Sequence, residues 1–295
     1  DIFPYTTLFR SRVSIFRDGR YVATRNFAET TLDEIIAMMV GREIKEKFPH
    51  IPVAKGEKIL EVSHLDSGMV KDVSFDLYAG EIIGLSGLMG AGRTELVRAI
   101  FGADPIENGT IKLDGEVIHV RHPLDAIEHG IVLGPEDRKK QGLCTELSIR
   151  ENVGLANLDR ICNRWGVVRS GVEKELTRRA IKDLRIKTPS GEQTAKNLSG
   201  GNQQKVVLAK WILTRPKVLI LDAPTVGVDI GAKDSIYKLI HRLSGVGISV
   251  LLITDEAPEA YYNCDRVLHM KQGKIINELI PSTLSEHQFA EAING

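Results

Sequence analysis

The sequence has few cysteines, few aromatic residues and no excess of either charge. Its 295 residues include three cysteines and 5% aromatic residues, and 39 basic side chains balance 39 acidic ones. Cys144, Cys162 and Cys264 are widely spaced and lack a His or Cys partner at metal-site spacing, so we expect unpaired thiols in a reducing compartment. Because a neutral chain has no global basic field, we predict no nucleic-acid partner.

Long apolar runs are also absent. No stretch approaches the ~18 residues that a membrane-spanning helix needs, so work at a membrane would require partners that span it. Hydrophobic residues make up 42% and charged residues 26% of the chain, as is typical of a globular domain. The length suffices for one large α/β domain with additional segments.

Two segments near the ends of the chain resemble each other. Arg12–Ala23 reads RVSIFRDGRYVA, and Arg266–Asn277, which begins 254 positions later, reads RVLHMKQGKIIN. Both patterns predict a β-hairpin, and each is followed by a short amphipathic helix, over 32–40 and 284–293. Similarity at domain spacing indicates duplication, so we interpret residues 12–40 as the tail of one copy, followed by a whole second copy. Chance similarity of two hairpins is the alternative.

These segments define the expected domain boundaries. Residues 1–11 fit nothing that follows and are interpreted as a non-native leader, with a genuine lead-in as the alternative. Residues 41–57 are charged, contain two prolines and are predicted to be a linker. Residues 58–280 are predicted to form the main domain, and 281–295 a C-terminal helical tail.

Within the main domain, strands alternate with helices. Continuous apolar strands at 217–222 and 249–254 are typical of a parallel sheet buried on both faces. The other predicted elements are an antiparallel pair at 58–65 and 70–78, a buried strand at 81–87, a helix at 93–102, a hairpin around Asp114–Gly115 and a polar helix at 170–184. The predicted fold class is α/β, with an antiparallel β edge subdomain and a helical insertion subdomain.

A glycine-rich turn follows the strand at 81–87. The segment Gly87–Thr94 reads GLMGAGRT and opens a helix, which is the context of a Walker A phosphate loop. Glycines let backbone N–H groups approach a polyphosphate, and a helix N-terminus favours its negative charge. The candidate phosphate ligands are Gly87, Gly90, Ala91, Gly92, Arg93 and Thr94.

Two side chains of this turn bear on its chemistry. The Thr94 hydroxyl is placed to hold Mg²⁺, whereas Arg93 occupies the position of the usual lysine and brings a planar fork instead of a compact ammonium. A ligand-free glycine turn is one alternative. A dinucleotide fingerprint at Gly84, Gly87 and Gly90 is another, but it lacks an acidic residue about 20 positions on.

A second glycine motif and an acidic strand end complete the pattern. LSGGNQQK at 198–205 opens a helix, and PKVLILDAPT at 216–225 is an apolar strand that ends at Asp222. This order and spacing resemble the signature motif and Walker B strand of ABC ATPases. GLMGAGRTEL, PEDRKKQGL, MMVGRE and LSGGNQQK with AKWI are similar to the ribose/galactose/xylose-type importers, in which two ATPase halves lie on one polypeptide. The resemblance covers roughly residues 12–295.

The resemblance implies a P-loop NTPase fold of the ABC ATPase type, with ATP and Mg²⁺ as cofactors. It implies an ATPase that energises import of a simple sugar at the cytoplasmic face of the inner membrane, as a peripheral subunit. The implied partners are a first ATPase half, on the same polypeptide or as a second copy, transmembrane permease subunits and, indirectly, a periplasmic sugar-binding protein. Import of nucleosides or other small solutes is one alternative. A soluble ABC protein of translation or DNA repair is another, but it expects coiled-coil insertions or basic linkers.

The resemblance also implies roles for individual residues. Asp222, Thr94 and Glu136 would hold Mg²⁺, and Asp222 and Glu136 are the candidate catalytic residues. The segment after Glu136, roughly 137–155, would transmit closure to a permease. The signature residues would grip the γ-phosphate of ATP held by the opposite half, with a simple helix cap at Ser199 as the alternative. They are Ser199, Gly200, Gly201 and Gln203.

Four positions depart from the family pattern. Arg93 replaces lysine, and Glu136 stands where a glutamine is usual. Ala223 replaces the glutamate that polarises the attacking water, a group that contributes roughly 10²–10⁴-fold to the rate. Asp255 replaces the switch histidine and would repel a γ-phosphate, and no aromatic residue near 66–70 can stack on adenine. We therefore predict that this half binds ATP with weak or no hydrolysis and completes the site of the first half. A non-catalytic regulatory or structural module is the alternative.

Overall fold

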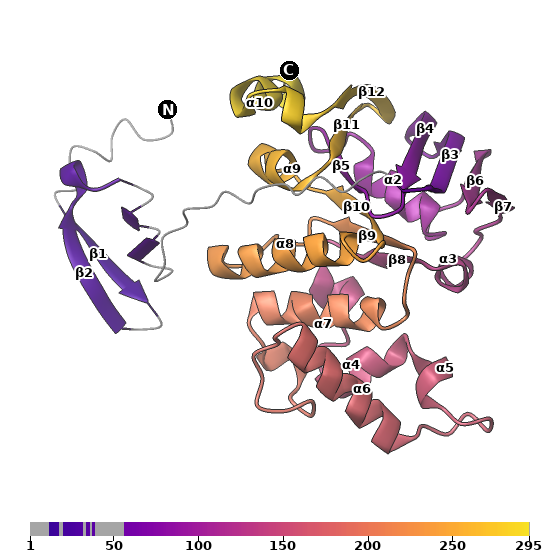
Figure 1. Cartoon of the computed structure of the whole chain (residues 1–295), viewed down its shortest axis with the longest axis horizontal. Coiled ribbons are helices and arrows are strands. Elements are labelled where there is room, and N and C mark those ends of the chain that lie inside the picture. The colour runs from indigo at the N-terminus through magenta and orange to yellow at the C-terminus, as the bar shows by residue number, and fades with distance from the viewer. Residues whose placement is uncertain (1–11, 18–19, 32–33, 36, 39–55, 295) are drawn as a thin grey trace. The chain divides into compact units, whose positions relative to one another are not determined.

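The structure, a computed structural model, describes residues 12–17, 20–31, 34–35, 37–38 and 56–294 (Figure 1). The chain divides into two compact units, Asp1–Pro49 and His50–Gly295. The predicted leader and most of the predicted linker lie outside the described residues. Of the helix predicted at 32–40, the described residues 34–35 and 37–38 are helical.

The smaller unit contains the first predicted hairpin. Strands β1 (Arg12–Arg17) and β2 (Arg20–Asn26) pair antiparallel and lead into a 3₁₀ turn at Phe27–Glu29. The second hairpin, β11 (Arg266–Lys271) and β12 (Lys274–Leu279), has the same pairing register 254 positions later. Even the bulge recurs, between Ile15 and Phe16 in one hairpin and between His269 and Met270 in the other. Both predicted hairpins are therefore confirmed, and their likeness extends to an irregularity of the backbone.

The larger unit is built on a six-stranded sheet in the order β12-β11-β5-β10-β9-β8. Its neighbouring strands run parallel except for the antiparallel pair β11–β12. The strands not yet placed are β5 (Ile82–Ser86), β8 (Ile131–Gly134), β9 (Val218–Asp222) and β10 (Ser249–Ile253).

The two faces of this sheet are covered by different helices, because alternate residues of each strand point to opposite faces. Ile82, Leu219 and Leu252 pack in a core with α7 (Gly200–Ile212), α8 (Ile230–Ser244) and α9 (Ala257–Asn263). The intervening residues Ile83, Ile220 and Leu251 pack in a second core with α2 (Arg93–Ile100). The strands thus bury both faces, as their unbroken apolar sequences predict.

A second, antiparallel sheet closes over α2. Its order is β4-β3-β6-β7, and its apolar residues share one core with the inner face of α2. Asp114 and Gly115 both have positive φ in the β6–β7 turn, as a type I′ hairpin requires. The predicted antiparallel edge is confirmed. Its strands are β3 (Lys58–Ser67), β4 (Val70–Tyr78), β6 (Asn108–Leu113) and β7 (Glu116–Ile118), and helix α3 (Pro123–His129) follows.

The predicted helical insertion lies between β8 and β9 and forms the end of this unit opposite the antiparallel sheet (Figure 1). It begins with a π-helical turn at Arg138–Gly142, and α4 packs in the same core as α7. Its helices are α4 (Ile149–Leu155), α5 (Leu158–Ile161) and α6 (Ser170–Asp183), and a 3₁₀ turn at Ala195–Asn197 precedes α7.

The chain continues after β12 through a 3₁₀ turn at Pro281–Thr283 into α10 (Glu286–Asn294). This helix matches the one predicted at 284–293, and Phe289 anchors it in the core. Within the described part of the chain, every helix is too short or too polar to span a bilayer.

Candidate functional site

The glycine-rich turn lies between β5 and α2, at the edge of the sheet where β9 and β10 also end. Parallel sheets commonly bind ligands at this edge. A Cβ atom on Gly87 would lie 2.2 Å from the carbonyl oxygen of Met270, so this position excludes every other residue. Gly92 has φ +98° as the residue before α2. Leu88 and Met89 are exposed at the tip. The tip of the turn, Leu88–Gly90, is therefore at the surface, and the positive end of α2, which begins at the buried Arg93, follows it directly in the chain.

Two of the predicted metal ligands are in direct contact. The Thr94 hydroxyl donates to Oδ2 of Asp222 at 2.9 Å. Asp222 is 4% exposed at the end of β9, and this burial raises its pKa to about 6; the Thr94 hydrogen bond opposes the shift, and the nearby Glu136 carboxylate adds to it. Glu136 itself is exposed just after β8. A hydroxyl with one buried and one exposed carboxylate is an oxygen donor set that suits Mg²⁺.

We expect Asp222→Asn to raise the free energy of unfolding by about 2 kcal/mol at pH 7.5, without metal or nucleotide. The folded protein holds the Asp222 proton more tightly than the unfolded chain does, because the folded pKa of about 6 lies above the ordinary carboxyl pKa of 3.8. The ionised carboxylate therefore destabilises the fold above pH 6, and this difference fades as pH falls towards 4. Urea unfolding of both proteins at pH 7.5 and pH 4.5 measures it. Equal stability at pH 7.5 would contradict the burial argument.

Arg93 and Asp255, two of the four positions that depart from the family pattern, form an ion pair. The Arg93 side chain is 9% exposed, and its Nη2 donates to Oδ1 of Asp255 at 2.5 Å. Its Nη1 donates to the carbonyl of Thr254 at 3.3 Å. Ala223, a third departure, is buried with φ +43° and donates its amide to the carbonyl of Ile253. The Arg93 guanidinium thus points to the residues that follow β10.

The signature turn lies at the start of α7. Ser199 is exposed at the N-cap position, and its hydroxyl accepts from the Asn202 side chain instead of a helix amide. A simple cap therefore does not account for Ser199. Gln203 is 3% exposed and donates to the carbonyl of Ala195, so it is buried, unlike the exposed Ser199.

The glycine pair of the signature allows a close approach of α7 to the loop after β9. A Cβ atom on Gly201 would lie 2.4 Å from the Cβ of Ala232, near the start of α8. A Cβ atom on Gly200 would lie 2.7 Å from the carbonyl oxygen of Gly227. Larger residues would push α7 away from this loop.

Arg138 is a residue that the sequence did not mark as important. It is buried two positions after Glu136, and its Nη1 and Nη2 donate to the carbonyls of Val226 and Gly227 at 2.6 and 3.1 Å. Burial lowers its pKa. Arg138 therefore joins the start of the helical insertion to the loop beside the signature turn. PEDRKK contains three basic residues, and nothing in the sequence indicates which of them is buried.

Glu259 is a second residue that the sequence did not mark as important. Its carboxylate is nearly buried in α9 and accepts from the hydroxyls of Tyr237 at 2.5 Å, Thr254 at 2.7 Å and Thr225 at 3.0 Å. Lys233 Nζ donates to the other carboxylate oxygen at 3.0 Å. Thr225 follows β9 and Thr254 follows β10, so Glu259 ties together the strand ends that carry the site.

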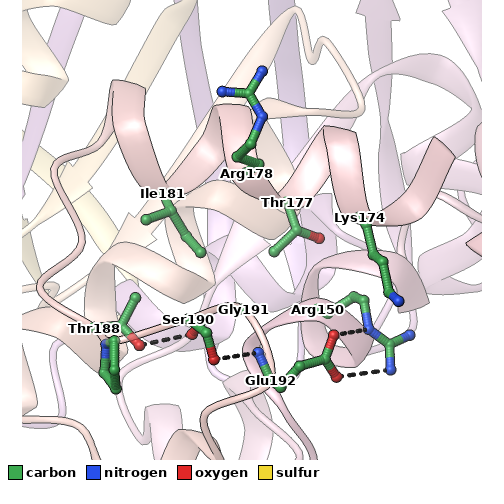
Figure 2. Close-up of a pocket in the computed structure, with 10 residues that line it drawn as sticks. Arg150, Lys174, Thr177, Arg178, Ile181, Thr188, Ser190, Gly191 and Glu192 are labelled. Atoms are coloured by element: carbon green, nitrogen blue, oxygen red, sulfur yellow. Dashed lines mark hydrogen bonds and ion pairs between the residues drawn. The ribbon is translucent and has the colours of Figure 1, made fainter. Parts of the chain in front are cut away.

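A separate cavity of about 370 Å³ lies in the helical insertion, between α6 and residues 188–192 (Figure 2). Arg150 donates to both carboxylate oxygens of Glu192, at 2.9 and 3.1 Å. Arg178 points away from the 188–192 segment and pairs with Glu175. Both guanidinium groups are thus paired with glutamates, and the lining of this cavity contains no residue of the Gly87–Thr94 turn.

Comparisons with known proteins also indicate a nucleotide-binding domain. The family model described as "ABC transporter" matches residues 70–226. Ribose import ATP-binding protein RbsA 3 of Rhizobium meliloti is 47% identical over 277 residues, which are 93% of this chain and 55% of that protein. Ribose import ATP-binding protein RbsA of Geobacillus kaustophilus is 43% identical over 285 residues, which are 96% of this chain and 58% of that protein. The chain thus spans between half and two thirds of these relatives.

Solved structures agree on the fold. The structure of cbiO1 from Clostridium perfringens, described as part of the ABC transporter complex cbiONQ, superposes with a TM-score of 0.66. It is 23% identical and covers 81% of this chain and 95% of its own. A nucleotide-free ATP-binding cassette from an ABC transporter also reaches 0.66 at 21% identity, over 81% of this chain and 95% of its own. At these identities the likeness concerns the fold alone.

Proposed function

Because the chain belongs to the ABC transporter family, we propose that it is an ATP-binding half of a sugar-import ATPase of the ribose/galactose type. The observation that carries the proposal is the meeting of the Gly87–Thr94 turn with Asp222 at the carboxyl edge of the parallel sheet. Relatives named for ribose import, at 43–47% identity, support the substrate class.

In this proposal the amides of Gly90–Thr94 bind the phosphates of ATP. Thr94, Asp222 and Glu136 would hold Mg²⁺, which supplies positive charge that offsets the phosphates and the buried carboxylate. The chain's own residues would fix the position of the phosphates, since Gly87 seats the turn against Met270 and the N-terminus of α2 follows the turn.

The arrangement of the whole protein is part of the proposal. The hairpin that repeats in register at 12–26, together with relatives nearly twice as long as the matched part, supports a tandem protein. Residues 12–40 would be the tail of a first ATPase half, 41–57 a linker, 58–280 the second ATPase domain and 281–295 its tail. Transmembrane permeases and, indirectly, a periplasmic sugar-binding protein would be the partners, at the cytoplasmic face of the inner membrane.

We further propose a division of labour between the halves. The site of this half lacks a base at Ala223, and its Arg93 is engaged by Asp255. At the start of its signature helix Ser199 is exposed and Gly200 is half-buried, which leaves this end of α7 open to contact with a second nucleotide, whereas Gly201 is buried. This half would thus bind ATP with weak or no hydrolysis and complete the active site of the first half. The buried alanine at 223 also favours the second candidate, a purely regulatory nucleotide-binding half.

ATP turnover of this chain alone and of the same chain joined to a first half tests the proposal. We expect turnover only in the joined protein, together with a strong reduction when Ser199 is replaced by arginine. A regulatory half would give a joined protein whose turnover is insensitive to Ser199→Arg. Equal turnover per site in the isolated chain would contradict the division of labour.

A further inference from the structure

The side chain that should meet the terminal phosphate already has a carboxylate partner. In a Walker A loop the basic residue reaches the β- and γ-phosphates. Here that residue is Arg93, which is 9% exposed and held by Asp255 at 2.5 Å and by the Thr254 carbonyl at 3.3 Å. The Asp255 carboxylate therefore binds Arg93 in the way that a phosphate oxygen would.

Asp255 is also exposed to solvent. Its side chain is 62% exposed, whereas that of its partner is almost fully covered. A terminal phosphate that approached Arg93 would come next to this carboxylate, and two anions at such a distance repel each other. The phosphate must either share Arg93 with Asp255 or displace it.

The phosphates nearer the nucleoside meet a different environment. They are expected at the backbone amides of the turn and at the N-terminal end of α2, neither of which depends on the Arg93 side chain. The turn is positioned by the contact of Gly87 with Met270, away from Asp255. The Arg93–Asp255 pair thus weakens binding of the γ-phosphate more than binding of the β-phosphate, which the amides of the turn also hold.

We propose, on the basis of the function proposed above, that the Arg93–Asp255 pair makes this a nucleoside-diphosphate site. The site binds MgADP at least as tightly as MgATP, because the γ-phosphate gains little from a neutralised guanidinium and meets a carboxylate beside it. Arg93 and Asp255, which both depart from the family pattern, then act together to set the preference between nucleoside diphosphate and triphosphate. A nucleotide with a diphosphate end can remain bound in this half.

Calorimetric titration of the full chain with MgATP and with MgADP, at fixed Mg²⁺ and ionic strength, tests the inference. We expect the ratio of Kd for MgATP to Kd for MgADP to be one or greater in the parent protein. In Asp255→Asn the ratio should fall about tenfold, because the charge beside the γ-phosphate is gone and Arg93 is released.

Glu256→Gln is the matched control. Glu256 is the next residue, its side chain is 59% exposed, and it is held by Lys233 instead of Arg93. The control removes the same charge from the same loop and should leave the ratio within twofold of the parent. The Asp255 side chain is 62% exposed and asparagine has nearly the same volume, so the replacement introduces no steric clash.

The outcomes separate this inference from the proposed function. Preferential binding of MgATP by the parent, or an unchanged ratio in Asp255→Asn, would overturn the inference and leave ATP binding intact. An equal shift of the Kd ratio in Glu256→Gln would show that removal of any nearby negative charge has this effect. That result would also overturn the inference. Absence of binding of either nucleotide would remove the proposed function, and this inference with it.

Discussion

Replacing Glu259 with alanine is expected to lower the free energy of unfolding by about 3–5 kcal/mol. The carboxylate accepts hydrogen bonds from Thr225, Tyr237 and Thr254 and an ion pair from Lys233, and all of these groups are partly or fully buried. Alanine would leave three hydroxyls without this acceptor, and desolvated polar groups that lose a partner retain their full penalty. For a domain of this size the melting temperature should fall by roughly 10 °C.

Thermal and urea unfolding of the two proteins in the absence of nucleotide measure this effect. Glu256→Ala is the appropriate control, since Glu256 also pairs with Lys233 but is 59% exposed. Exposed pairs contribute about 0–1 kcal/mol, so the control should melt close to the parent. If Glu259→Ala and Glu256→Ala were equally stable, the carboxylate would not join the strand ends as the structure indicates.

Gly87→Ala is expected to weaken MgATP binding by at least tenfold. A methyl group at this position would lie 2.2 Å from the Met270 carbonyl oxygen, which belongs to backbone of the sheet and cannot rotate away. The turn must therefore move, and amides that no longer converge on one point lose their hold on a phosphate. Equilibrium titration with MgATP gives the ratio of dissociation constants.

Gly115→Ala separates this effect from the general penalty of replacing a glycine. Gly115 has φ +81° in the β6–β7 turn, and a Cβ atom there would meet nothing within 4 Å. The substitution carries the cost of a left-handed alanine, about 1 kcal/mol of stability, without moving the phosphate turn. Its MgATP affinity should equal that of the parent. A Gly87→Ala protein that bound MgATP as the parent does would show that the turn tolerates displacement.

The elements that carry the site were predictable because their signals are local. The strand that ends at Asp222 is an unbroken apolar run, and the turn at Gly87–Thr94 lies between such a strand and a helix. Both hairpins were predicted from a glycine turn between apolar strands, and the structure confirms them. Glycines that seat a turn or a helix start are visible in the sequence as motifs, because their roles depend on a few consecutive residues.

The pairings within the site were not predictable, because they join residues far apart in the chain. Arg93 and Asp255 appeared in the sequence as two separate departures, and only the adjacency of β5 and β10 makes them partners. Arg138 and Glu259 lie in ordinary charged segments, and their burial depends on how the helical insertion and α9 pack. Gln203 shows the opposite case: a motif residue that faces the core of its own domain.

Hydrogen–deuterium exchange tests most directly whether the amides between Gly90 and Thr94 hold the phosphates of a nucleotide. Exchange of backbone amides is followed in the isolated chain with and without saturating MgATP. We predict strong protection of peptides that cover Gly87–Ile100 and little change in those that cover Ser199–Lys205, which in the proposed arrangement contact a nucleotide only when a second half is present. Protection confined to other regions, such as the cavity beside residues 188–192, would contradict phosphate binding at Gly90–Thr94.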